Sequence, residues 1–118
     1  MPRRVTEYMI DNTGQSAVAR GELARRRVRG ITFFDKNKVP ILGVRRDPEV
    51  ELWKVDHIPS GMVVRKMATK EQALAVAAEV SPLIDWATVQ IDDPRSLREV
   101  YPVVVAAERR AWAMFPSR

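Results

Sequence analysis

The chain lacks cysteine and has a single histidine, His57, among 118 residues. Without cysteine there are no disulfide bonds, no thiolate nucleophiles and no cysteine-based metal centres, a composition typical of reducing compartments. A metal site would have to depend on carboxylates, and the adjacent acids Asp92 and Asp93 precede Pro94, where a helix cap explains them better. We therefore expect no metal and no cofactor.

Glycine-rich loops and long apolar runs are also missing. The five glycines are scattered, and none belongs to a phosphate-binding loop pattern. No apolar run approaches the roughly 18 residues of a membrane span, and the basic N-terminus has no apolar signal-peptide segment. These absences predict a cytoplasmic protein that does not bind membranes.

Catalytic residues are equally scarce. His57 would need a nucleophile and an orienting carboxylate to act as a general base. Ser60 and Asp56 are near it in sequence, but adjacent residues of a strand point to opposite faces. A histidine that caps a turn or packs on Trp53 is the simpler interpretation, and we expect the protein not to be an enzyme.

Basic residues are concentrated at the N-terminus. Residues 1–30 hold seven arginines against three acids, a net charge of +4, whereas residues 31–118 carry a net charge of +1. Within this region the stretch "RGELARRRVRG", residues 20–30, holds five arginines and one glutamate. A localised basic segment on a nearly neutral body predicts an acidic partner.

Local patterns predict an α+β fold. Residues 1–15 are expected to be a flexible N-terminal segment in which "TEYMI" could form a short strand. Residues 16–118 are expected to form one domain that begins with a basic helix or arm, from the possible cap Ser16 to Gly30. Next come β-branched and aromatic runs separated by turns, "ITFF", "VPILGV", "VELWKVDHI" and "MVVRKM", which predict an antiparallel meander.

Two helices are predicted after the strands. "TKEQ" at Thr69 is a capping box that starts a helix over residues 69–81. Asp93 and Pro94 start a second helix, which we expect to kink or break at Pro102. The predicted fold is thus an antiparallel sheet of three to four strands, packed by two C-terminal helices.

The arginine stretch allows two interpretations. Guanidinium groups suit bidentate phosphate contacts, and such dense like charges repel one another, which makes a purely stabilising role hard to explain. The alternative is a solvated face or tail that only raises solubility. The aromatic residues are expected in the core, but Phe33 or Phe34, if exposed beside arginines, would instead be a base-stacking platform.

Residues 50–80 resemble the small sheet-plus-helix DNA-binding modules of phage-type integrases. The resemblance rests on Trp53, Gly61, Arg65, Lys66, Thr69, Lys70 and Ala73. It implies that the sheet enters the major groove, with Lys54, Arg65 and Lys66 as contacts. The chain is also similar to double-stranded-RNA-binding domains in its predicted helix, strands and helix over residues 16–80, and in style to small accessory proteins of actinobacterial phages.

Two functions follow as hypotheses. The first is a non-enzymatic nucleic-acid-binding module that contacts phosphates, with DNA favoured over RNA; its predicted contacts are Arg20, Arg25, Arg26, Arg27, Arg29, Lys54, Arg65 and Lys66. The second is a phage or bacterial regulator that docks on a host protein or forms a homodimer. Its predicted surface is the C-terminal end, where residue types common in interfaces gather: Arg110, Trp112, Met114 and Phe115.

Overall fold

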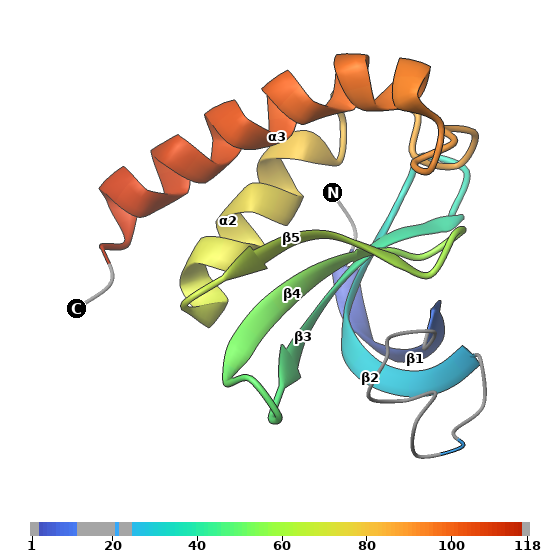
Figure 1. Ribbon diagram of the computed structural model, residues 1–118, viewed down its shortest axis with the longest axis horizontal. Helices are drawn as coiled ribbons and strands as arrows, with labels where there is room; N and C mark the ends of the chain where they lie inside the picture. Colours follow the sequence, from blue (N-terminus) through green and yellow to red (C-terminus); the bar gives the residue numbers. More distant parts are fainter. Residues whose placement is uncertain (1–2, 12–20, 22–24, 117–118) are drawn as a thin grey trace.

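The computed structural model describes residues 3–11, 21 and 25–116, and it is α+β: a five-stranded antiparallel sheet with two helices (Figure 1). The strands follow one another in chain order across the sheet. They are β1 (Arg3–Asp11), β2 (Arg25–Phe34), β3 (Pro40–Asp47), β4 (Leu52–His57) and β5 (Met62–Met67), followed by the helices α2 (Lys70–Val80) and α3 (Pro94–Met114).

The N-terminal region differs most from the prediction. Residues 25–30 belong to strand β2 and are not helical, while residues 12–20 and 22–24 of the expected segment and helix lie outside the described residues. Strand β1 pairs with β2 over nine consecutive residues, from Arg3 opposite Phe33 to Asp11 opposite Arg25. This ladder pairs the facing backbone groups of the two strands. Strand β2 also contains β-branched residues and a glycine, which disfavour a helix. The sheet therefore has five strands, not three to four.

Helix α2 packs on one face of the sheet. Leu42 and Val44 of β3 and Val55 of β4 lie on this face, and all three are almost fully buried. The helix contributes a stripe of small apolar side chains at helical spacing, namely Ala73, Val76, Ala77 and Val80. The predicted cap is confirmed, because the Thr69 hydroxyl accepts a hydrogen bond from the Gln72 amide at 3.2 Å.

Helix α3 lies across α2 on the side away from the sheet (Figure 1). Asp93 caps its first turn, as predicted, by accepting from the Arg95 amide at 2.9 Å. The helix does not break at Pro102, which lies within its 21 residues. Pro102 is exposed, so the carbonyl that loses its intrahelical partner can be hydrated, and the neighbouring Val100 and Val104 are buried on the other side of the helix.

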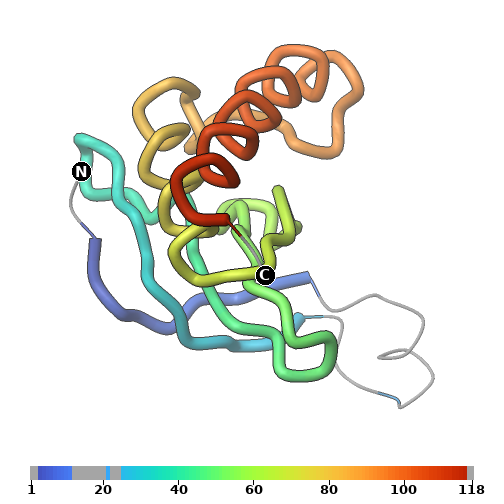
Figure 2. Tube along the Cα trace, turned by 90° about the vertical axis from the view of Figure 1, so that its left-hand side faces the viewer, coloured from blue at the N-terminus to red at the C-terminus, as the bar shows by residue number. Residues whose placement is uncertain are grey.

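Strands β1 and β2 bend together as one ribbon (Figure 2). The bend carries the end of β1 to the β4–β5 turn, where the Asp11 amide donates to the Gly61 carbonyl at 2.7 Å. Gly61 has a φ of 75°, and a Cβ there would lie 2.7 Å from the Asp11 nitrogen. Glycine is required for the turn and for this contact, which brings the two edge strands of the sheet together at one point.

Candidate nucleic-acid interface

Three of the predicted arginines share one side of strand β2. Arg25, Arg27 and Arg29 are all exposed, and the unbroken register with β1 keeps alternate residues on the same side. Same-side residues repeat at about 6.6–6.8 Å along a strand. The strand therefore spaces the three guanidinium groups regularly, which a helix would not have done.

Arg46 of β3 extends this set, and it was not singled out from the sequence. Ile31 and Val44 are direct cross-strand partners and so share a side. Arg29 lies two residues before Ile31, and Arg46 lies two residues after Val44. Because the strands are antiparallel, both arginines lie beyond this pair in the same direction and on the same side, and both are exposed. We call Arg25, Arg27, Arg29 and Arg46 the arginine row.

Two acids of β1 lie within the same surface. Glu7 is the direct partner of Arg29, and Asp11 is the direct partner of Arg25. Glu7 also approaches Arg27, with its Oε2 3.6 Å from Nη1, and both side chains are more than half exposed. Four arginines against two acids leave this surface with a net charge of about +2. Exposed pairs of this kind are weak, so the guanidinium groups remain available to other anions.

The remaining predicted N-terminal contacts are placed differently. Arg26 is exposed on the other side of β2, where its partner in β1 is the buried Ile10. Arg20 lies outside the described residues. The arginine stretch is therefore divided between two faces by the strand, and Arg26 does not belong to the arginine row.

The contacts implied by the integrase resemblance do not form one surface. Lys54 and Lys66 are cross-strand partners on the side of the sheet away from α2, but Lys54 Nζ is 2.6 Å from Asp47 in a largely buried pair. Arg65 is on the opposite side, where it binds Glu108 of α3 and lies 5.3 Å from the Tyr101 ring. Lys66 alone of the three is exposed.

Element order bears on both resemblances. Residues 50–80 do form two strands, a turn and a capped helix, the local order expected of the integrase-type module. The helix–strands–helix order of the RNA-binding domain needs a helix up to residue 30, and residues 25–30 are strand. The second resemblance therefore does not hold for the described residues.

The alternative docking residues are largely exposed at the end of α3. Trp112 and Met114 are 50% and 67% exposed, and Phe115 is 37% exposed. Arg110 is engaged by Glu79 of α2, with its Nε 2.7 Å from Oε1. The side-chain nitrogen of Gln72, Nε2, donates to the Phe115 carbonyl at 2.6 Å, and this bond attaches the end of α3 to α2.

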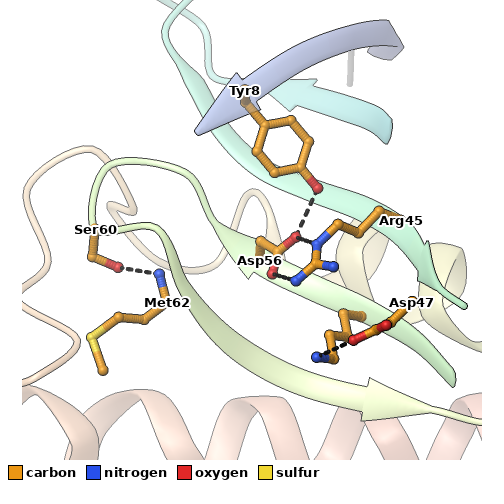
Figure 3. A network of polar contacts seen from close by, with 7 residues as sticks. Tyr8, Arg45, Asp47, Asp56, Ser60 and Met62 are labelled. Atoms are coloured by element: carbon orange, nitrogen blue, oxygen red, sulfur yellow. Dashed lines mark hydrogen bonds and ion pairs between the residues drawn. The ribbon is translucent and has the colours of Figure 1, made fainter. Parts of the chain in front are cut away.

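A buried polar network lies on the face of the sheet away from α2 (Figure 3). Arg45 Nε donates to Asp56 Oδ2 at 2.7 Å, and the Tyr8 hydroxyl donates to the same oxygen at 2.8 Å. All three side chains are more than 90% buried. Burial raises the pKa of Tyr8, and the Asp56 carboxylate raises it further. The tyrosine therefore stays a neutral donor, which suits a structural role.

Glycine makes room for this network. A Cβ on Gly43 would overlap the Tyr8 ring, and a Cβ on Gly30 would be 2.5 Å from the Val44 carbonyl oxygen. The ring thus lies directly across β3 to reach Asp56 of β4 (Figure 3). No local sequence pattern connects Tyr8 with a carboxylate 48 residues away.

His57 is fully buried and makes two hydrogen bonds. Nε2 is 2.7 Å from the Trp86 carbonyl, which can only accept, so Nε2 carries the proton and Nδ1 accepts from the Ser60 hydroxyl at 2.7 Å. Of the two roles expected for His57, it has the turn contact, through Ser60, while its ring contact is with Trp86, at 5.8 Å between centroids. Burial lowers the pKa of His57. The Ser60 oxygen also accepts from the Met62 amide at 3.1 Å, an arrangement that fastens the β4–β5 turn.

A basic recess lies at the other end of the β1–β2 ribbon. It has a volume of about 310 Å³ and is lined by Arg3, Arg4, Phe34 and Lys38. The Arg4 guanidinium carbon lies 4.9 Å from the centre of the Phe34 ring, and that of Arg3 lies 5.8 Å from the buried Phe33 ring. Phe34 is half-buried beside Arg4, which meets only in part the condition of an exposed ring set for a base-stacking role, and Phe33 is buried. Arg3 and Arg4 were not predicted as contacts, and the sequence signal that points to them is their position in the basic N-terminal region.

The described residues hold neither a cluster of metal ligands nor a membrane-spanning helix. In this part of the chain, no group of three histidine and acidic side chains could hold a metal ion. Neither of the described helices is long and apolar enough to cross a bilayer.

Comparisons with known proteins give no relative. No protein-family model, no curated protein and no solved structure matches this chain. The geometry of its own residues is therefore the basis for a functional proposal.

Proposed function

We propose that this protein is a small, non-enzymatic nucleic-acid-binding module that binds phosphates through the arginine row, with DNA as its expected partner. The observation that carries the proposal is the row itself: four exposed arginines on one side of two neighbouring strands. Guanidinium groups bind phosphates bidentately, and each neutralised phosphate releases counterions. Phosphate contacts position a protein on nucleic acid without reading its sequence.

The test is fluorescence anisotropy of labelled duplex DNA over a salt series. The test variant is Arg25→Ala, Arg27→Ala and Arg29→Ala together. The matched control removes the same charge from exposed positions of α3, with Arg95→Ala, Arg98→Ala and Arg109→Ala. We expect the test variant to lower the slope of log K against log salt by about 2 to 3, since each phosphate contact contributes about 0.7–0.9. Equal losses in the two variants would mean that only net charge matters, and the proposal would fail.

A second candidate is supported by the exposed apolar end of α3. Trp112 and Met114 are at least half exposed. Tryptophan and methionine are enriched in the cores of protein interfaces, where a partner buries them. This surface fits docking on a host protein or formation of a homodimer. Sedimentation of the wild type and of Trp112→Ala over a range of concentrations tests the dimer: a wild-type association that the variant abolishes supports it, and monomers throughout exclude it.

A further inference from the structure

We propose that the recess lined by Arg3, Arg4, Phe34 and Lys38 holds an unpaired nucleobase, so that the preferred ligand is single-stranded nucleic acid. This inference rests on the proposed function and makes it specific. The recess volume of about 310 Å³ is at the small end of the range for ligand sites, which suits one nucleotide.

The lining of the recess combines the two groups that a nucleotide requires. Three cations, Arg3, Arg4 and Lys38, can contact phosphate, and Phe34 offers an aromatic ring. Among the described residues, none of those that line the recess is acidic. The nearest acid in sequence, Asp35, accepts hydrogen bonds from the amides of Asn37 and Val39 at 2.8 and 3.0 Å and so belongs to the β2–β3 turn.

The position of Arg4 over Phe34 shows that the ring already binds a flat cation. Their separation of 4.9 Å is within the range of a cation–π contact. Bases stack on aromatic rings and on guanidinium planes alike. A base can therefore extend the Arg4–Phe34 stack or take the place of the guanidinium, which then remains available for a phosphate.

The requirement for a single strand follows from base geometry. In a duplex both faces of each base are covered by neighbouring bases, so a base reaches an aromatic side chain only when it is unstacked. Non-specific binding of single strands typically combines a basic track with stacking aromatic residues. Here the track is the arginine row and the stacking residue is Phe34.

The two parts are within reach of one strand. Arg3 is the direct partner of Phe33, and Arg29 lies four residues before Phe33 on the same side of β2. Along the strand this is roughly 13–14 Å. Arg4 and Phe34 face the other side of the ribbon, so a strand whose base stacks on Phe34 passes around the ribbon end at Arg3 before its later phosphates reach the arginine row.

The experiment compares three labelled probes in anisotropy titrations: a 15-nucleotide oligo(dT), a duplex of the same length, and an oligo(dT) whose central positions are abasic. The variants are Phe34→Leu, Phe34→Trp and the control Tyr101→Leu, which removes an exposed aromatic ring of α3 outside the recess and the arginine row. Urea unfolding of each variant establishes that it is folded.

The expected result is specific to the base. Phe34→Leu weakens binding of intact oligo(dT) by about 5- to 150-fold, which corresponds to the ~1–3 kcal/mol of stacking one base on an aromatic ring. The same change leaves duplex binding and abasic-strand binding within twofold, Phe34→Trp retains binding, and Tyr101→Leu has no effect.

Failures of the two proposals are distinguishable. If Phe34→Leu changes none of the probes, or weakens all three equally, the recess does not hold a base, while loss of binding in the β2 triple variant still supports the arginine row. If the wild type binds no probe even at low salt, both proposals fail.

Discussion

Several basic residues of β3, β4, β5 and α3, here called the protein body, have different surroundings from those of the β1–β2 ribbon. In the body, Arg45, Lys54, Arg65 and Arg110 each contact a carboxylate. On the ribbon, the described residues show one ion pair, Glu7 with Arg27, and it is long and exposed. The remaining described ribbon arginines are exposed, and two of them, Arg3 and Arg4, lie over the Phe33 and Phe34 rings.

The difference has a physical cause. A buried charge without a partner is costly, so Arg45 is retained inside the protein because Asp56 neutralises it. An exposed arginine is hydrated and needs no partner. Cations that bind a polyanion are expected among the exposed ones that no carboxylate of the described residues pairs with, which include Arg46 and Lys38 beside the ribbon arginines, because a neighbouring carboxylate already neutralises the charge of the others.

The largest expected effect comes from breaking the buried network. Asp56→Ala leaves Arg45 as an uncompensated buried charge and removes the acceptor of Tyr8. We expect a loss of about 3–5 kcal/mol in the free energy of unfolding, measured with urea. The ribbon counterpart, Glu7→Ala, should cost no more than about 0.5 kcal/mol; similar losses in both variants would remove the distinction between the two regions.

A steric change tests the same network without altering charge. Gly43→Ala places a methyl group against the Tyr8 ring, and such overpacking costs about 1–3 kcal/mol. In a Tyr8→Ala background the obstacle is absent, so the cost should shrink. Urea denaturation of the two single variants and the double variant measures this coupling. Additive losses would show that Gly43 is needed for some other reason.

Acidification tests the buried histidine. The folded-state pKa of His57 is lowered, so as pH falls below about 6.5 the unfolded chain binds a proton first and stability decreases. One group contributes a slope of at most about 1.4 kcal/mol per pH unit. Urea midpoints between pH 7.5 and 5 should fall in the wild type and stay flatter in His57→Gln. The pKa of Asp47 is lowered from its ordinary value of 3.8, so this carboxylate affects stability only at pH values below the range measured here.

The smallest effect should appear on the ribbon. Glu7→Gln removes an acid that faces Arg29 and Arg27. Surface pairs are worth roughly 0.2–1 kcal/mol, so nucleic-acid affinity should rise about 1.4- to 5-fold at low salt. The rise should disappear at high salt because exposed charges are screened. An unchanged affinity at low salt would place the phosphate contacts elsewhere.

Prediction from sequence succeeded where the signal is local. The Thr69 cap, the Asp93–Pro94 helix start and the strands from residue 31 to residue 67 depend on residues that are neighbours in the chain. The helix expected around Arg25–Arg29 was wrong because its alternative, pairing with β1, involves residues about 20 positions away.

The candidate site was predicted only in part. The arginines of β2 were found from charge density, but their division into two faces required knowledge of the strand. Strand pairing places Arg46 beside the arginines of β2 and Arg4 over Phe34. Arg65 is paired with Glu108 of α3, which is 43 residues away in the chain.

The sequence by itself determined the α+β class, the caps and the concentration of positive charge near the N-terminus, because these depend on composition and short-range spacing. The tertiary structure alone decided which cations are available. Pairing of β1 with β2, and packing of α3 on α2, bring acids to some basic residues and leave others in solvent. Electrostatic and packing energies depend on distance in space, and distance in space is not encoded by position along the chain.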